Sequence, residues 1–101
     1  MIAYKLFKVR KDGSIGSLFF AAKDKLPTGI WLKAKSLHKK GFAFRPGWHT
    51  CCLPYAPHLS LRGRAWFRVR IKGWKKHVRP VLQGGTWYTA NQIRIEDRIN
   101  A

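Results

Sequence analysis

The clearest alternation of apolar and charged side chains runs over residues 65–72. The apolar positions are Phe67, Val69 and Ile71, and the alternate positions are Trp66, Arg68, Arg70 and Lys72. Because successive side chains of a strand point to opposite faces, this pattern predicts a strand with one apolar and one basic face. Gly73 is expected to end the strand, and residues 74–81 are expected to form a basic connection.

Shorter patterns predict further strands and the turns between them. Alternation covers residues 4–10, 30–35 and 92–96. Lys11-Asp12-Gly13-Ser14 is typical of a hairpin turn, because Asp-Gly supplies the positive backbone angles that a tight turn needs. Residues 15–22 are then expected to return as a strand, although a helical turn also fits them. A second turn is expected at residues 26–29.

Residues 41–59 show no clear period. These 19 residues hold three Pro, two Gly, two His and two Cys. They are expected to form a long irregular segment that includes a short helix at most. Irregular segments of this length in compact domains are usually functional or packed by their own side chains.

Length and composition indicate one small, mostly β domain. The chain has 101 residues, of which 46% are hydrophobic and 14% aromatic, so it can bury a core. Residues 1–101 are expected to form a single basic domain of the α+β class. Its architecture should be a twisted antiparallel sheet or partly open barrel with at most one or two short helices.

Neither a membrane segment nor a disulfide is expected. No apolar run approaches the roughly 18 residues that a membrane helix needs. Cys51 and Cys52 are adjacent, and neighbouring cysteines rarely pair because the geometry is strained. A reducing cytoplasm is the expected compartment.

The net charge is the property of the composition that says most about the partner. The chain carries 21 Lys and Arg against four acids, and no Asp or Glu lies between Lys25 and Ile95. A surface this positive indicates a polyanion or an acidic protein as the partner. The same stretch lacks the carboxylates that many catalytic mechanisms use.

The basic face of residues 65–72 is the first candidate binding site. Cations at every second position could follow phosphates, and an aromatic ring among them could stack on an unpaired base. The alternative is a solvated outer face of a half-buried sheet, although such a face usually mixes charges of both signs. The expected nucleic-acid-binding residues are Trp66, Arg68, Arg70, Lys72, Trp74, Lys75, Lys76 and Arg79. A second basic run comprises Lys33, Lys35, His38, Lys39 and Lys40.

His49 and His58 are the candidates for acid–base catalysis. Two histidines with nearby cations can cleave RNA without a carboxylate, since one imidazole accepts a proton while the other donates one. The alternative is that both imidazoles fix the shape of an irregular loop by bonding to its backbone. Their spacing from Cys51 and Cys52 is not that of a zinc site, so no metal or other cofactor is expected. Both thiols are expected to be small buried hydrophobes.

Several motifs resemble a group of small proteins from bacteriophages and prophages. They are Arg45-Pro46-Gly47-Trp48-His49, Ala56-Pro57-His58 and Gln83-Gly84-Gly85-Thr86-Trp87-Tyr88, within a similarity that spans nearly the whole chain. The resemblance implies a viral protein in the cytoplasm of a bacterial host, without implying an activity. A function shared by the group would lie in residues 84–88 and in the loop that holds Arg45, Trp48, His49 and His58. Members of the group tend to carry acids where this chain has Arg68, Arg70, Lys72, Lys75 and Lys76.

These observations favour a binding protein over an enzyme. We expect a small basic phage-type protein that binds DNA or RNA through phosphate contacts and aromatic stacking. The first alternative is a host-takeover or counter-defence inhibitor that docks on an acidic surface of a host protein. The second is a small His-dependent enzyme, either RNase-like or, from a looser likeness carried by His49-Thr50 and Glu96, similar to ADP-ribosyltransferases.

Overall fold

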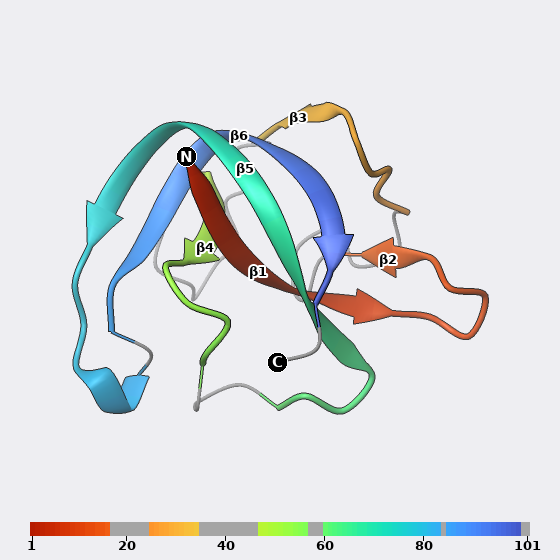
Figure 1. The fold of residues 1–101 in the computed structure, drawn as a ribbon, viewed down its shortest axis with the longest axis horizontal. Helices are drawn as coiled ribbons and strands as arrows, with labels where there is room; N and C mark the ends of the chain where they lie inside the picture. The colour runs from red at the N-terminus through yellow and green to blue at the C-terminus, as the bar shows by residue number, and fades with distance from the viewer. Residues whose placement is uncertain (17–24, 35–46, 57–59, 84, 100–101) are drawn as a thin grey trace, which may run out of the picture.

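The computed structural model describes residues 1–16, 25–34, 47–56, 60–83 and 85–99, which form one curled antiparallel sheet (Figure 1). Its strands are β1 (Ile2–Val9), β2 (Ile15–Gly16), β3 (Trp31–Lys33), β4 (Trp48–Cys51), β5 (Arg64–His77) and β6 (Trp87–Arg98). A 3-10 turn, η1 (Val81–Gln83), is the one helical element among these residues. The prediction of a mostly β fold with little helix is therefore confirmed.

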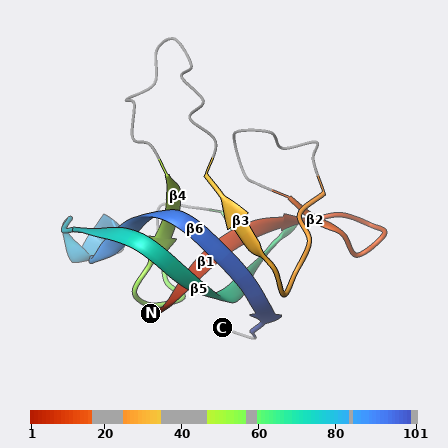
Figure 2. The ribbon, with the colours of Figure 1, turned by 90° about the horizontal axis from the view of Figure 1, so that it is seen from above.

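The strands pair so that the sheet turns back on itself. β5 pairs with both β1 and β6, and β4 pairs with the same two strands. The contact between β1 and β4 is a single bridge, Tyr4 with Cys51, so the sheet curls without closing into a barrel. Figure 1 shows β5 and β6 as two long curved ribbons side by side, and Figure 2 shows β3 and β4 on the same side of them.

The predicted turn at residues 11–14 connects β1 to β2. Asp12 accepts hydrogen bonds from the Ser14 amide at 2.9 Å and from the Ser14 hydroxyl at 2.6 Å. The backbone of Arg10 bonds to Ser14 and to Gly13, and Gly13 takes the positive φ of 84° that the sequence predicted. The returning strand is described only as Ile15–Gly16, because residues 17–24 lie outside the described ranges.

β5 does not end at Gly73, so that prediction is wrong. The strand continues to His77 and stays paired with β6, from Lys72 with Gln92 to His77 with Trp87. Gly73 has φ +59°, a conformation that glycine adopts without the steric cost of a Cβ. The glycine therefore bends the strand within the sheet. The stretch predicted as a basic connection is strand up to His77.

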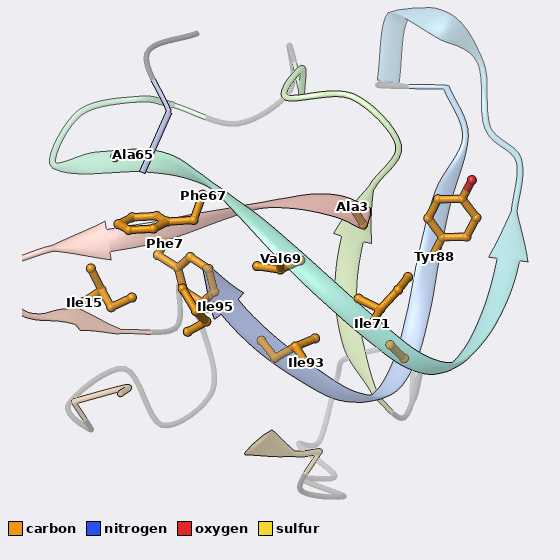
Figure 3. Packing of buried hydrophobic residues seen from close by; sticks show 11 residues of the cluster. Ala3, Phe7, Ile15, Ala65, Phe67, Val69, Ile71, Tyr88, Ile93 and Ile95 are labelled. Carbon is orange, nitrogen blue, oxygen red and sulfur yellow. The ribbon is translucent and has the colours of Figure 1, made fainter. Parts of the chain in front are cut away.

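The core lies inside the curl and follows its turn. Figure 3 shows Val69, Ile93 and Ile95 pointing into the space between the strands, with Phe7 and Phe67 at one end and Tyr88 at the other. Ala90 and Ile93 are both in this cluster, although they are three positions apart on one strand. A strand presents opposite faces at positions that differ by an odd number. β6 must therefore turn over between them, opposite Gly73.

The segment predicted to be irregular contains β4. Trp48 and Thr50 face the core while His49 and Cys51 face outward, and all four pair with residues 87–90 of β6. The indole Nε1 of Trp48 donates to the Leu32 carbonyl at 3.1 Å, which connects β4 to β3 along the edge of β6 that both strands share. The remaining predictions in this region, Arg45 and His58, lie outside the described residues, as do Lys35, His38, Lys39 and Lys40.

Candidate nucleic-acid interface

Trp66 does not belong to the exposed basic face. Only 5% of its surface is exposed, because Leu6 and Ala56 pack on it in a second, smaller hydrophobic cluster on the outside of the sheet. Its ring has no face open to a base, contrary to the prediction. Arg68, Arg70 and Lys72 are exposed as predicted.

The register of the sheet gives acidic partners to cations that lie in the acid-free stretch of the sequence. Asp97 accepts two hydrogen bonds from the Arg68 guanidinium, at 2.9 and 3.1 Å. Glu96 lies 3.1 Å from Arg70 and 2.7 Å from Arg94. Exposed ion pairs of this kind stabilise a fold by only about 0–1 kcal/mol. Their larger effect here is to neutralise much of the stripe that the sequence made purely basic.

The aromatic ring in this part of the surface is Trp31, which the sequence did not single out. The Lys72 ammonium lies 4.0 Å from the centroid of the Trp31 ring, and the Arg94 guanidinium lies 5.7 Å from it. Trp31 and Arg70 both pair with Arg94 across the sheet, from opposite sides. Lys33 and Lys72 flank Gln92 in the same way, so the described member of the second basic run shares a face with the first.

Among the described residues, the cations at the far end of β5 have no acidic partner of this kind. Lys75 and Lys76 are exposed, and beside them 47% of the Trp74 surface is exposed, its ring edge-on to Tyr88 at 5.4 Å between centroids. The structure describes three carboxylates, and each one is paired elsewhere. Asp12 pairs with Lys25 at 3.1 Å, and the other two belong to the Arg68–Arg94 group. In Figure 1, the β1–β2 hairpin and the end of β6 lie away from the end of β5.

A cluster of imidazole, indole and guanidinium groups lies on the outward face of β4 and β6. We call His49, His77, Arg79, Trp87 and Thr89 the Trp87 cluster. The His77 ring stacks on Trp87 at 4.4 Å between centroids, the His49 ring lies at 5.1 Å, and the Arg79 guanidinium lies 4.3 Å from the same centroid. His77 Nε2 is hydrogen-bonded to the Thr89 hydroxyl at 2.9 Å.

This cluster joins two motifs that are far apart in the sequence. His49 comes from the Arg45–His58 loop and Trp87 from the 84–88 segment, which are the places where the resemblance to phage proteins implied a shared function. Sequence reasoning paired His49 with His58 and treated His77 only as part of a basic loop. The signal for His77 is its cross-strand position opposite Trp87, which only the register of β5 on β6 reveals.

Lys5 lies beneath the cluster and is partly buried. It occupies the inward face of β1 between the buried residues Ala3 and Phe7, and its ammonium donates to the His49 carbonyl at 2.8 Å. Burial lowers the pKa of Lys5 to about 8, and a weaker interaction with Cys51 acts in the other direction.

The surroundings of Cys51 do not favour a reactive thiolate, and the described residues do not form a metal site. Burial raises the pKa of Cys51, and the positive charges of Lys5 and Arg79 offset this only in part. The neutral thiol is therefore favoured, which argues against Cys51 as a thiolate nucleophile. Both cysteines are free. Across the described ranges, no three His, Cys, Asp or Glu side chains come together as a metal site would require.

Comparisons with protein-family models, with curated proteins and with solved structures give no match for this chain. In the parts of the chain that the structure describes, no helix is long and apolar enough to cross a bilayer. Support for the candidate interface therefore comes from its geometry and its charge alone.

Proposed function

We propose that this protein binds single-stranded nucleic acid through β5 from Lys72 onward and the segment after it. Phosphates would contact Lys72, Lys75, Lys76 and Arg79, and a base would stack on Trp74. The observation that carries the proposal is the distribution of carboxylates. All three that the structure describes neutralise other cations and leave Lys75 and Lys76 without a described acid nearby.

The geometry suits an extended backbone of phosphates. Adjacent residues of a strand point to opposite faces, so Lys76 shares a face with Trp74 and Lys75 shares a face with His77. An extended backbone that follows the edge of β5 could contact both lysines. Trp74 has 47% of its surface exposed on the face that it shares with Lys76, and stacking on an exposed indole contributes about 1–3 kcal/mol per base. Such contacts give little sequence discrimination, because phosphates are common to all sequences.

An acidic protein surface is the other partner that this charge would attract. Nucleic acid is the partner that would use both features of this site, since phosphates would contact the lysines while a base stacks on the exposed Trp74 ring. The proposal includes a location in the cytoplasm of a bacterial host, as the resemblance to phage proteins implies.

Two matched double variants test the proposal. K75Q/K76Q removes two cations beyond Gly73, and R68Q/R70Q removes two cations that are paired with acids. Affinity for labelled single-stranded DNA and RNA oligonucleotides would be measured by fluorescence anisotropy over a series of salt concentrations. K75Q/K76Q should weaken binding strongly and reduce the slope of log affinity against log salt by about 2. R68Q/R70Q should change both quantities less.

Two results would count against the proposal. Equal loss of affinity in the two variants would mean that total charge matters and the location does not. Absence of binding by the unmodified protein at low salt, combined with retention of one acidic protein from nuclease-treated host lysate, would favour the inhibitor alternative.

A further inference from the structure

The rows of the sheet place two histidines at opposite corners of one small surface. Lys75, Thr89 and His49 form one row across β5, β6 and β4. His77, Trp87 and Cys51 form the next row. Although His49 and His77 come from different strands, both imidazole centroids lie within 5.1 Å of the Trp87 centroid. Trp87 is 8% exposed, so its ring acts as a floor between them rather than as an open stacking surface.

We infer that the Trp87 cluster is a catalytic site for cleaving the phosphodiester backbone of single-stranded RNA, with His49 as the general base and His77 as the general acid. His49 takes the proton from a ribose 2′-hydroxyl, whose oxygen then forms a bond to the adjacent phosphorus. The bond from phosphorus to the 5′-oxygen breaks, and His77 gives that oxygen a proton. The products are a 2′,3′-cyclic phosphate and a 5′-hydroxyl, so atoms and charge balance without a metal or a co-reactant.

The hydrogen bonding of His77 supports its role as the acid. Its Nε2 is bonded to the Thr89 hydroxyl, and in the described structure its Nδ1 makes no hydrogen bond. When both nitrogens are protonated, Nε2 donates to Thr89 and Nδ1 remains available to donate to the leaving oxygen. Stacking on Trp87 fixes the plane of the ring and thereby the direction in which Nδ1 points. Thr89 is therefore a positioning residue.

The surroundings suit a transition state with extra negative charge. The charged and titratable groups near the two rings are Arg79, Lys75 from β5 and Cys51 from β4, while Lys5 from β1 bonds to the His49 carbonyl from the inward face. Arg79 is close enough to share the Trp87 ring with both histidines, so its guanidinium can stabilise a pentacoordinate phosphorus. None of the described carboxylates lies here to repel the phosphate.

This inference rests on the proposed function, because the RNA must first be bound. The test is a single-turnover assay with a labelled single-stranded RNA, in the presence of a metal chelator, and with products identified by mass spectrometry. The same oligonucleotide with 2′-deoxyribose at every position is the substrate control. The unmodified protein should cleave the RNA to cyclic phosphate ends and leave the deoxy strand intact.

The variants are H49N, H77N, T89V and H58A, with K25Q beside the remote hairpin as a control at a site outside the cluster. H49N and H77N should each slow cleavage by about 100-fold or more, while anisotropy still reports RNA binding and circular dichroism a folded protein. K25Q should cleave as the unmodified protein does. T89V should retain binding and shift the alkaline limb of the pH–rate profile, which a purely structural role for Thr89 would not do.

The outcomes separate this inference from the proposed function. Binding of RNA without cleavage overturns the catalytic site and leaves the proposed function intact, whereas loss of both overturns both. Cleavage that survives in H77N but is lost in H58A overturns the assignment of the acid to His77. Cleavage that survives equally in all variants overturns the site as a whole.

Discussion

Gly73 lies so close to Asn91 that a Cβ on the glycine would meet the amide nitrogen Nδ2 at 2.6 Å. The two residues face each other across β5 and β6 at the point where the core changes from one face of β6 to the other. Since Gly73 also has φ +59°, this position combines close approach with a conformation that favours glycine. We therefore expect the bend that β5 and β6 share to depend on Gly73 and Asn91.

Replacing each of three glycines that have positive φ by alanine should lower the free energy of unfolding by different amounts. Gly13 faces open space, Gly73 faces the end of a side chain, and Gly47 would place a Cβ 2.8 Å from the Ala90 carbonyl oxygen. G13A should cost about 1 kcal/mol from backbone strain alone. G73A should cost more, and G47A most, because backbone cannot move aside as Asn91 can. Urea unfolding measures the order, and a cost for G13A equal to that of G47A would contradict it.

Trp66 and Trp74, the two tryptophans of β5 that were expected to stack on bases, should differ clearly in their effects on stability and on binding. Replacing the buried Trp66 by alanine should lower the free energy of unfolding by about 3–5 kcal/mol, as for other large core truncations. Replacing the half-exposed Trp74 should cost only about 1 kcal/mol, because one edge-to-face ring contact is lost. W74A should weaken oligonucleotide binding. Similar unfolding costs for both variants would show that the exposure assigned to Trp74 is incorrect.

Removing the acid next to Arg68 should extend the cationic surface. D97N abolishes the ion pair with Arg68 and should steepen the salt dependence of oligonucleotide binding by up to about 1 in slope. D12N removes the same charge at the β1–β2 hairpin and should change binding less, because it releases Lys25 rather than a cation of β5. Neither should alter the free energy of unfolding by more than about 1 kcal/mol. A larger effect on binding from D12N would contradict the placement of the interface.

Lys5 should make the free energy of unfolding increase with pH over part of the alkaline range. Burial lowers its pKa in the folded protein to about 8 from an ordinary value of 10.5. Between these values the unfolded chain binds more protons than the folded one, so the contribution of Lys5 to stability rises as pH increases from 8 to 10.5. The raised pKa of Cys51 acts in the opposite sense over the alkaline range.

The K5M variant isolates the Lys5 contribution from that of Cys51. The quantity to follow is the free energy of unfolding of K5M minus that of the unmodified protein, measured in urea at pH 7, 8, 9 and 10. It should decrease as pH rises through 8, because deprotonation relieves the unmodified protein of a partly buried charge. A difference that stays constant over this range would mean that Lys5 remains hydrated.

Alternation predicted the strands from the sequence, and local turn chemistry predicted the hairpin. Residues 65–72 form strand as expected, and Asp12-Gly13 forms the expected turn, because both depend on neighbours in the chain. The continuation of β5 through Gly73 was missed, since a glycine that bends a paired strand has the same local sequence signal as one that ends it. β4 was missed because its four residues gain their partners only from β6.

The surroundings of the proposed binding face were harder to predict than the strand that carries it. Alternation placed Trp66 with Arg68 correctly, but the cover that Leu6 and Ala56 provide depends on segments far away in the sequence. The acids that neutralise Arg68 and Arg70 are 26 or more positions away, and only the sheet register brings them together. The contacts of Trp31 with Lys72 and of His77 with Trp87 have the same origin.

None of the three described carboxylates lies at the end of β5, so no described acid weakens the attraction of its cations for a polyanion. A positive surface potential steers a polyanion before contact is made. Lys75 and Lys76 would therefore be among the first residues that a polyanion meets. The pairing of Arg68 with Asp97 and of Arg70 with Glu96 therefore helps to determine which side of the protein the partner meets first.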